Sequence, residues 1–549
     1  MGVGEVSNNS TAGQLKDFAS RRKLTRREML RRLVCGVLVI PLARICGFAA
    51  GGSQKNPPYV LRIGVLRKKT FAGTIDSLKD YEVPEWFKNA RLGIWAHWGP
   101  QSAPEYGDWY ARNMYIQGTR QYRYHIVRYG HPSVFGYKDV INTWHGRNFD
   151  PDYLVRLYRR MGAQYFVSMG VHVDNFDLWN SAHTRWNSVN FGIRKDVVGL
   201  FRKAALKYGM RFGVSDHLWM AYKWMSVARG CDSSGPYAGI PYDGSDPQYS
   251  DLYGDCPVVY RKLPWDEEGI PEKWKVHWSL RIKDLIDKYE PDLLYCDGPI
   301  PFGSIGLDVV AHFYNVNLRA NGGRLEAVYT CKSIEQAGQG ICVLDKERGV
   351  VEDPWPAPWQ TCTCVGNWHY DIKAVYKTPK QIVDMFVDII VRGGRLLLNF
   401  PLRCDGTLDS EELRIIYELT DWISVNREAI FESRPWKIWG AGPTRHKVDP
   451  SAKYTEYLRV PLTHQDVRFM CGDRLLYVFF MGWPETRFLR IDSLAIGQPH
   501  VVGRIRSVQL LGTNAPVRWE QDHTGLKVWL PPEPPCKYAA VLKIVGLET

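Results

Sequence analysis

The chain has 549 residues, of which 45% are hydrophobic and 23% are charged, as in an ordinary globular protein. At about 100–200 residues per domain, this length predicts two or three domains, or one large barrel with an accessory domain. The formal net charge is +13; no nucleic-acid-binding motif accompanies it, so we expect no nucleic-acid partner, although the charge mildly favours an anionic substrate.

The N-terminal segment has the layout of an export signal. Basic residues crowd positions 20–32, an apolar stretch covers 33–45, and a run of small residues follows. The pair Arg26-Arg27 resembles the bacterial twin-arginine signal, and the apolar stretch is too short for an ordinary transmembrane helix. We therefore expect residues 1–52 to be a cleaved signal peptide, and the mature protein to be periplasmic or extracellular without stable membrane insertion. The alternative is a basic amphipathic helix that stays attached as a tether.

Between about residues 85 and 400, short apolar runs alternate with amphipathic helical stretches. We predict strands at 91–97, 164–170, 211–215, 293–296 and 395–399, and helices at 151–161, 195–208, 280–289 and 379–392. Strands separated by helices indicate βα units around a parallel sheet. We therefore expect an α/β fold, a (β/α)8-like barrel, over residues 60–432.

The pattern changes after about residue 435, where short apolar runs lie between turns that contain glycine and proline. We predict strands at 475–480, 508–511, 526–530 and 539–545. No convincing helix separates them, so a C-terminal all-β sandwich domain is expected over residues 433–549. This domain either binds glycan or braces the barrel, and bracing is the simpler role.

The twelve cysteines show no paired C-x-x-C spacing, so a zinc site of the usual kind is not expected. Nothing else in the sequence demands a metal ion or a cofactor, and we predict neither. In an exported protein, a disulfide between Cys231 and Cys256 is one interpretation. Free buried thiols are the other.

Polar side chains follow several predicted strands, at the end of the barrel where catalytic residues lie. They are His97, His172, Asp174, Asp216, His217 and Asp297, and Trp98, Trp109, Trp179, Trp219 and Trp224 accompany them. Each of these residues alone more often has a structural role, but together we expect them to converge at one open end of the barrel. This combination suits the cleavage of a glycoside. A carboxylate can attack the anomeric carbon or, when protonated, give a proton to the leaving oxygen, while imidazoles bind hydroxyl groups and indoles pack on the apolar face of the sugar.

The amino-acid sequence of these segments resembles glycoside hydrolase family 29, the α-L-fucosidases, over about residues 85–443. The landmarks, in order, are Trp86 to Gly99, Gly107 to Tyr110, His172 to Trp179, Trp186-Asn187, Asp297-Gly298, Pro358 to Cys362 and Gly393 to Asn399. The resemblance implies a retaining exo-glycosidase that hydrolyses terminal α-L-fucosides through a covalent glycosyl-Asp intermediate. The expected partner is a fucosylated oligosaccharide or polysaccharide; the oligomeric state is not predicted.

The resemblance also implies roles for individual residues. Asp297 matches the family's nucleophile, and His97, Trp98, Trp109 and His172 match positions that contact the sugar. We add further candidate substrate-binding residues near these positions, namely Asp108, Asp174, His217 and Trp359.

Two departures from the family pattern leave the sugar open. Val173 stands where the family usually has the second histidine of a pair, and the segment from Val214 to Trp219 is atypical. We therefore keep relatives of fucose, such as L-galactose or a sulfated fucose, beside fucose itself. Val173 also favours the alternative function, a degenerate barrel that binds glycan without hydrolysing it.

The acid/base partner of Asp297 falls on a variable loop of the family. The candidates are Glu326, Glu335, Glu347 and Glu352. We favour Glu347, which lies just ahead of the Pro358 landmark, with Glu352 as the alternative. Retention requires the two carboxyl groups to lie about 5–5.5 Å apart, and the acid to have a raised pKa.

Overall fold

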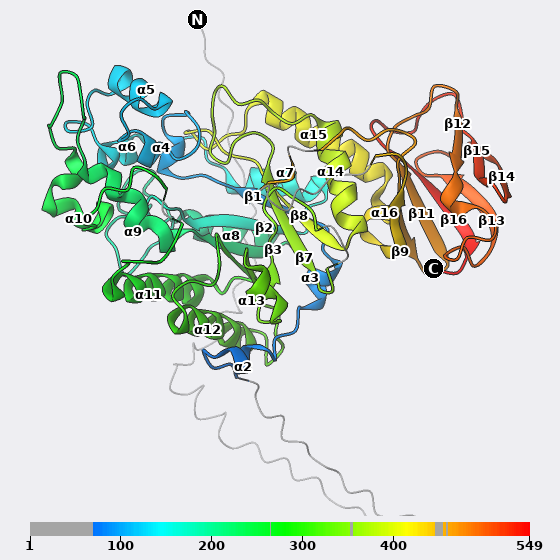
Figure 1. The fold of residues 1–549 in the computed structure, drawn as a ribbon, viewed down its shortest axis with the longest axis horizontal. Helices are drawn as coiled ribbons and strands as arrows, with labels where there is room; N and C mark the ends of the chain where they lie inside the picture. Colours follow the sequence, from blue (N-terminus) through cyan, green and yellow to red (C-terminus); the bar gives the residue numbers. More distant parts are fainter. Residues whose placement is uncertain (1–69, 264, 352–354, 445–453, 457–458) are drawn as a thin grey trace, which may run out of the picture. The chain divides into compact units, whose positions relative to one another are not determined.

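The computed structural model describes residues 70–549, except residue 264 and the segments 352–354, 445–453 and 457–458 (Figure 1). The predicted signal peptide at residues 1–52 lies outside the described residues. Within the part of the chain that the structure describes, no helix is both long and apolar enough to cross a membrane.

An eight-stranded parallel sheet forms the larger region and confirms the predicted barrel class (Figure 1). Its order is β6-β5-β4-β3-β2-β1-β8-β7. The strands are β1 Leu92–Ala96, β2 Tyr165–Val171, β3 Arg211–Asp216, β4 Leu293–Cys296, β5 Val328–Cys331, β6 Val343–Leu344, β7 Trp359–Cys364 and β8 Gly394–Asn399. Because the strands run parallel, their carboxyl ends meet at one end of the barrel.

The sheet nearly closes where its two outer strands, β6 and β7, meet. A bridge joins Asp345 to Gln360, and the backbone N–H of Lys346 donates to the Gln360 carbonyl at 2.8 Å. Inside the barrel, the Tyr165 hydroxyl donates to Oε1 of Gln360 and Nε2 of Gln360 donates to Oδ1 of Asp345, each at 2.8 Å. We call residues 345–349 beside β7 the seam.

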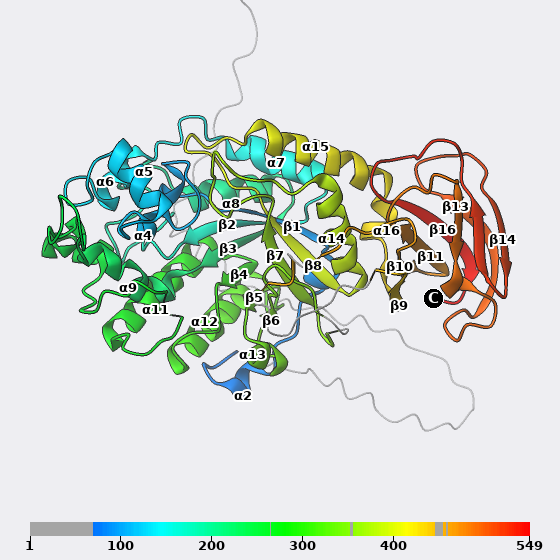
Figure 2. The ribbon, with the colours of Figure 1, turned by 45° about the horizontal axis from the view of Figure 1, so that its top comes forward.

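The longest helices cover the outer side of the sheet, and shorter ones lie in the connections between strands and beside the C-terminal sheet (Figure 2). They are α2 Ile75–Leu78, α3 Glu85–Asn89, α4 Tyr110–Asn113, α5 Arg120–Arg128, α6 Tyr137–Thr143, α7 Pro151–Met161, α8 Val197–Lys207, α9 Ala221–Trp224, α10 Ser250–Tyr253, α11 Glu272–Tyr289, α12 Ser304–Ala320, α13 Ile334–Gly338, α14 Pro379–Val391, α15 Ser410–Val425 and α16 Arg427–Phe431. The six longest pack side by side in the order α12, α11, α8, α7, α15 and α14.

Helix α7 shows how the sequence sets these elements. Asp150 caps its start by accepting from the backbone N–H of Tyr153 at 2.9 Å, and Pro151 occupies the first helical position. Gly162 ends the helix with φ 114°, which glycine adopts without strain. The apolar face that turns to the core consists of Leu154, Val155, Leu157, Tyr158 and Met161.

The C-terminal region consists of two antiparallel sheets and confirms the predicted all-β architecture (Figure 2). One sheet has the order β13-β16-β11-β10-β9 and the other β12-β15-β14. The strands are β9 Arg434–Ala441, β10 Val467–Gly472, β11 Leu475–Phe480, β12 Phe488–Ile491, β13 Gly503–Leu510, β14 Arg518–Asp522, β15 Gly525–Trp529 and β16 Ala540–Leu547. A buried apolar cluster with members on both sheets forms the core of this region.

Helix α14 joins the two regions, because it contacts β8 of the barrel and β9 and β10 of the C-terminal sheet. Asp388 on this helix and Arg468 on β10 form a fully buried ion pair, with Nε 2.5 Å from Oδ1. Nε1 of Trp422 on α15 donates to the Ala539 carbonyl at 2.7 Å. Among the described residues the cysteines are free thiols, Cys231 and Cys256 included, so these two are not joined.

Candidate active site

A cavity of about 470 Å³ opens at the carboxyl ends of strands β1 to β5. The first residue after each of these five strands lines it, and these residues are His97, His172, His217, Asp297 and Lys332. Glu347 enters from the seam, and an aromatic wall of Trp109, Trp219, Trp224, Trp265, Tyr295, Trp368 and Tyr454 surrounds them. The barrel topology thus brings six chemically active side chains into one space.

Two carboxylates and one ammonium group form the polar centre of this cavity. Nζ of Lys332 donates to Oδ1 of Asp297 and to Oε2 of Glu347. Burial alone would lower the pKa of Lys332, but Asp297 and Glu347 outweigh it and hold that pKa well above 10.5. Lys332 therefore remains an ammonium ion and keeps both carboxylates on the same side of the cavity.

The three imidazoles are each fixed from behind through Nδ1. Nδ1 of His97 lies 3.2 Å from Oδ1 of Asn399, the last residue of β8. Nδ1 of His172 lies 2.8 Å from Nε2 of Gln101. These contacts leave Nε2 of each ring to face the cavity.

His217 joins the imidazoles to the carboxylates. Its Nδ1 lies 3.3 Å from the carbonyl of Val171, and its Nε2 lies 3.9 Å from Oδ2 of Asp297. Burial lowers the pKa of His217 to about 4, although Asp297 opposes the shift. Burial and repulsion from neighbouring imidazoles hold the pKa values of His97 and His172 well below 6.5. The three rings are therefore neutral near pH 7 and can bind hydroxyl groups as donors or acceptors.

The aromatic wall is tied to the polar centre. Nε1 of Trp219 donates to the Asp297 carbonyl at 2.8 Å. Gly298 adopts φ 143°, and a Cβ there would lie 2.8 Å from the Trp219 ring, so the close approach requires glycine. The guanidinium of Arg348 lies 5.1 Å from the Trp368 ring centre, which places a cation beside the aromatic wall.

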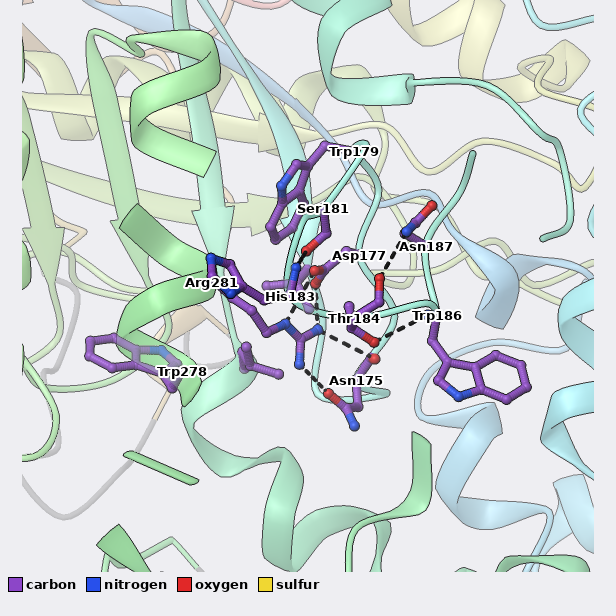
Figure 3. A network of polar contacts seen from close by, with 12 residues as sticks. Asn175, Asp177, Trp179, Ser181, His183, Thr184, Trp186, Asn187, Trp278 and Arg281 are labelled. Atoms are coloured by element: carbon purple, nitrogen blue, oxygen red, sulfur yellow. Dashed lines mark hydrogen bonds and ion pairs between the residues drawn. The ribbon is translucent and has the colours of Figure 1, made fainter. Parts of the chain in front are cut away.

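A buried network holds the loop after β2, which carries His172 (Figure 3). Asn175 adopts φ 62°, and its side-chain oxygen accepts from Arg281 at 2.5 Å. Arg281 also forms an ion pair with Asp177, with Nη2 2.5 Å from Oδ1 and both side chains fully buried. Helix α11, which carries Arg281, thus fixes the loop that delivers His172 to the cavity.

The cavity brings together most of the predicted catalytic and binding residues, namely His97, Trp109, His172, His217, Asp297 and Glu347. The alternative acid Glu352 lies outside the described residues. Glu326 binds Arg211 and Arg324 away from the cavity, and Glu335 is exposed on α13.

Two predicted sugar contacts are placed elsewhere by the structure. Trp98 is buried against Trp144, with ring centres 4.9 Å apart, and its Nε1 donates to the Arg403 carbonyl. Trp359 is the first residue of β7, so it lies at the end of the barrel opposite the cavity. Its ring fills the space above Gly394, where a Cβ would lie 2.5 Å away. Both indoles are therefore core residues.

Asp108 lies behind the residues that line the cavity. Its Oδ1 accepts from the backbone N–H of His369 at 2.6 Å and its Oδ2 from that of Trp368 at 3.3 Å. It does not line the cavity but holds the segment that carries Trp368, which does.

Asp174 is also buried beside the cavity without lining it. Its Oδ2 accepts a 2.5 Å hydrogen bond from the Tyr137 hydroxyl, while its Oδ1 has no hydrogen-bond partner among the described residues. Burial raises the pKa of Asp174 from 3.8 to about 6, against the lowering effect of the Tyr137 bond. Asp174 therefore lies behind the residues that line the cavity.

We expect Asp174→Asn to gain stability relative to the wild type as the pH rises. Folding raises the pKa of Asp174, so the folded chain holds this proton to a higher pH than the unfolded chain does, and wild-type stability falls from about pH 4 to about pH 6. The neutral amide escapes this loss, so its advantage should grow by about 2–3 kcal/mol between acid and neutral conditions. Urea unfolding at about pH 4.5 and pH 8 measures it, and a difference that stays constant with pH contradicts the expectation.

Several cavity residues were not predicted, above all Lys332, and also Tyr295, Trp265, Trp368 and Tyr454. Lys332 follows the short run Val328–Cys331, which is β5. The sequence signal that could have identified Lys332 as a cavity residue is its position directly after this short apolar run.

The chain is similar to known proteins over most of its length. The family model described as Alpha-L-fucosidase matches residues 62–428, and the Alpha-L-fucosidase C-terminal domain matches 461–545. The plasma alpha-L-fucosidase of Homo sapiens is 24% identical, over 87% of this chain and 93% of that protein. The tissue alpha-L-fucosidase of Rattus norvegicus is 25% identical, over 84% and 88%.

Solved structures share the fold. The alpha-fucosidase of Thermotoga maritima in complex with fucose superposes with a TM-score of 0.65 at 21% identity, over 86% of this chain and 100% of that one. Alpha-L-fucosidase isoenzyme 1 from Paenibacillus thiaminolyticus gives a TM-score of 0.61 at 18% identity, over 85% and 98%.

Proposed function

The chain belongs to the alpha-L-fucosidase family, a family of glycoside hydrolases, and from that premise we propose that it removes terminal α-L-fucosyl residues from oligosaccharides or polysaccharides with retention of configuration. Asp297 is the proposed nucleophile and Glu347 the proposed acid/base.

The observation that carries this proposal is that one ammonium group binds both carboxylates. Lys332 donates to Asp297 and to Glu347 within the same cavity. Two oxygens that share one ammonium donor at about 2.8 Å each lie at most about 5.6 Å apart. Retaining glycosidases hold their carboxyl groups about 5–5.5 Å apart, and inverting ones about 6.5–9.5 Å apart to admit a water molecule. The short separation supports retention.

In the first half of the proposed reaction, the Asp297 carboxylate attacks the anomeric carbon as the bond to the leaving oxygen breaks. Glu347, in its protonated form, gives its proton to that oxygen. The product is a glycosyl ester on Asp297 and a free alcohol.

In the second half, Glu347, now a carboxylate, takes a proton from water as the water oxygen attacks the anomeric carbon. The ester bond breaks and returns the electron pair to Asp297, so both groups regain their starting states. The Lys332 ammonium stays beside Asp297 and compensates the charge that leaves and returns to it.

The neutral imidazoles and the aromatic wall support recognition of a sugar. His97, His172 and His217 present nitrogen atoms to hydroxyls, and the indole faces pack on C–H groups. Val173 lines the cavity beside His172, and an apolar side chain there removes one hydrogen bond that a histidine would offer. Fucose is the first substrate proposed, and L-galactose the relative to compare.

A sulfated fucose is the alternative substrate, and it would have to bind beside the charges of the cavity. Among the described residues that line the cavity, Lys332 is the one cation, and two carboxylates engage it. A sulfate group would have to displace a carboxylate from Lys332, at the cost of a buried charge left without its partner.

A panel of aryl glycosides tests the function directly. We expect turnover of an aryl α-L-fucoside, with the α-anomer of fucose as the first product seen by proton NMR. Release of the β-anomer first would refute the retaining mechanism. The alternative function, glycan binding without hydrolysis, requires a glycan that binds to the chain although no member of the panel is cleaved.

We expect Glu347→Ala to slow substrates with poor leaving groups most. A phenyl α-L-fucoside needs protonation of its leaving oxygen, so its kcat/KM should fall by about 10²–10⁴-fold. A dinitrophenyl α-L-fucoside leaves without a proton, so its glycosylation step should change little. The ratio of the two kcat/KM values, measured for variant and wild type, reports the acid role.

Glu335→Ala is the matched control, because Glu335 is an exposed glutamate on α13 that does not line the cavity. It should leave both substrates unaffected. If Glu347→Ala slows both substrates equally, Glu347 is not the acid.

We also propose that the protein is exported by the twin-arginine route. The support is the arginine pair and apolar stretch of the N-terminal segment. Substitution of Arg26 and Arg27 by lysine should leave the protein in the cytoplasm of an expressing bacterium, as fractionation would show.

A further inference from the structure

Three buried imidazoles of the cavity form a cluster whose geometry goes beyond sugar binding. His97, His172 and His217 each offer a ring nitrogen, and these atoms all lie within 4.8 Å of one another. The rings come from the ends of three adjacent strands, β1, β2 and β3. All three side chains are buried apart from the face they turn to the cavity.

Because Nδ1 of each ring is already engaged, Nε2 is the nitrogen that each ring has left for a metal ion. Nδ1 of His97 faces Asn399 and that of His217 faces the Val171 carbonyl. Both acceptors fix a proton on Nδ1, which leaves the Nε2 lone pair directed at the cavity. Metal-binding histidines have this second-shell arrangement, since an acceptor on the far nitrogen orients the ring and raises its basicity.

We propose that His97, His172 and His217 form a site for one divalent transition-metal ion of the zinc class, and that the bound ion excludes the sugar. Three imidazole nitrogens suit zinc, cobalt, nickel and copper, whereas magnesium and calcium require oxygen ligands. The fourth coordination position faces the cavity, toward Asp297, whose Oδ2 lies 3.9 Å from Nε2 of His217.

The metal and the sugar hydroxyls compete for the same nitrogen atoms. A zinc ion held by the three rings would occupy the space that the sugar needs beside Asp297. The predicted consequence is inhibition by zinc that is competitive with the glycoside.

Gln101 determines whether His172 can take part. In the arrangement observed, Nε2 of Gln101 donates to Nδ1 of His172, so the His172 proton lies on Nε2. Oε1 of Gln101 is buried and has no hydrogen-bond partner among the described residues. Rotation of the amide by half a turn would present Oε1 to Nδ1–H and free the Nε2 lone pair for a metal. The orientation of the Gln101 amide thus determines whether Nε2 of His172 donates a hydrogen bond to the sugar or binds a metal ion.

This dependence supplies a variant that should bind metal more tightly. In Gln101→Glu, a carboxylate would accept from Nδ1–H of His172 in every orientation, and such second-shell partners change metal affinity by about 10–100-fold. A structural role for Gln101 alone would predict no gain.

The test uses the full chain and zinc chloride in isothermal titration calorimetry, with cobalt chloride as a spectroscopic probe. We expect one zinc ion per chain at this site, visible bands of four-coordinate cobalt, and no such binding of magnesium. His217→Ala should weaken zinc binding by at least about 100-fold, and Gln101→Glu should strengthen it by about tenfold or more.

His523→Ala is the control for binding by surface histidines, since His523 is exposed in the C-terminal region. It should leave the zinc isotherm unchanged. Zinc binding that survives His217→Ala, or that Gln101→Glu leaves unchanged or weakens, overturns the proposal, as does the absence of a one-to-one site. Because these measurements do not use turnover, they separate failure of the metal site from failure of the glycosidase assignment.

Discussion

Replacement of Asp297 by alanine is expected to lower kcat/KM for an aryl α-L-fucoside by about 10⁴-fold or more. The substitution removes the group proposed to bond to the anomeric carbon. It also leaves a space beside Lys332 that a small anion can fill. Added azide should enter that space, attack the anomeric carbon in place of the carboxylate and release a fucosyl azide. Release of the aryl alcohol measures the rate, and NMR of the azide product identifies the route.

The rescue distinguishes a missing nucleophile from a damaged fold. Asp287→Ala is a matched control, because Asp287 lies on α11 and binds His312 away from the cavity, with Oδ1 2.7 Å from Nε2. It should keep the wild-type rate and gain nothing from azide. Substantial turnover by Asp297→Ala without azide would refute the assignment of the nucleophile.

Replacement of Arg281 by methionine is expected to lower the free energy of unfolding by about 3–5 kcal/mol. The side chains of Arg281 and Asp177 are both fully buried, with Nη2 2.5 Å from Oδ1 (Figure 3). Burial already raises the pKa of Asp177 above 3.8, and Arg281 is the chief influence that lowers it. Without Arg281, the carboxylate is left in the core with no opposite charge. Urea unfolding near pH 7 measures the loss.

The surface pair of Arg414 and Glu418 on α15 provides the comparison. Its Nη1 lies 2.7 Å from Oε1, and the arginine is about half exposed, so Arg414→Met should cost only about 0–1 kcal/mol. The double variant Asp177→Asn with Arg281→Met should recover part of the loss, because it removes the uncompensated charge. An Arg281→Met variant no less stable than Arg414→Met would contradict the importance of the network.

The architecture was predicted where elements are long or strongly apolar. The predicted helix at 151–161 coincides with α7, whose cap, proline and glycine signals are all local. In contrast, β6 is only two residues long, and its place in the sheet depends on contacts with β5 and β7, which no local pattern records. Helix α11 begins at Glu272, earlier than the predicted 280, and Pro271 is its N-cap residue. Its buried residues begin only at Trp278, so no apolar face marks the first turns in the sequence.

The site was predicted where the chemistry follows directly after a strand. His97, His172, His217 and Asp297 satisfy that rule, and all four line the cavity. Trp359 was misplaced because it begins its strand, and only the strand direction shows that it faces the opposite end. The rule would also have found Lys332 if the short run before it had been recognised as β5.

The incomplete closure of the barrel gives the two carboxylates unequal support. Asp297 follows β4, which is paired on both sides, whereas Glu347 lies on the seam beside a two-residue strand. Attack on the sugar and protonation of the leaving group are thus carried by parts of the scaffold that can be altered separately. For a designer who wants a different range of leaving groups, residues 345–349 are the segment to exchange. The sugar-binding half of the cavity, which is fixed by β1 to β4, would keep its own specificity.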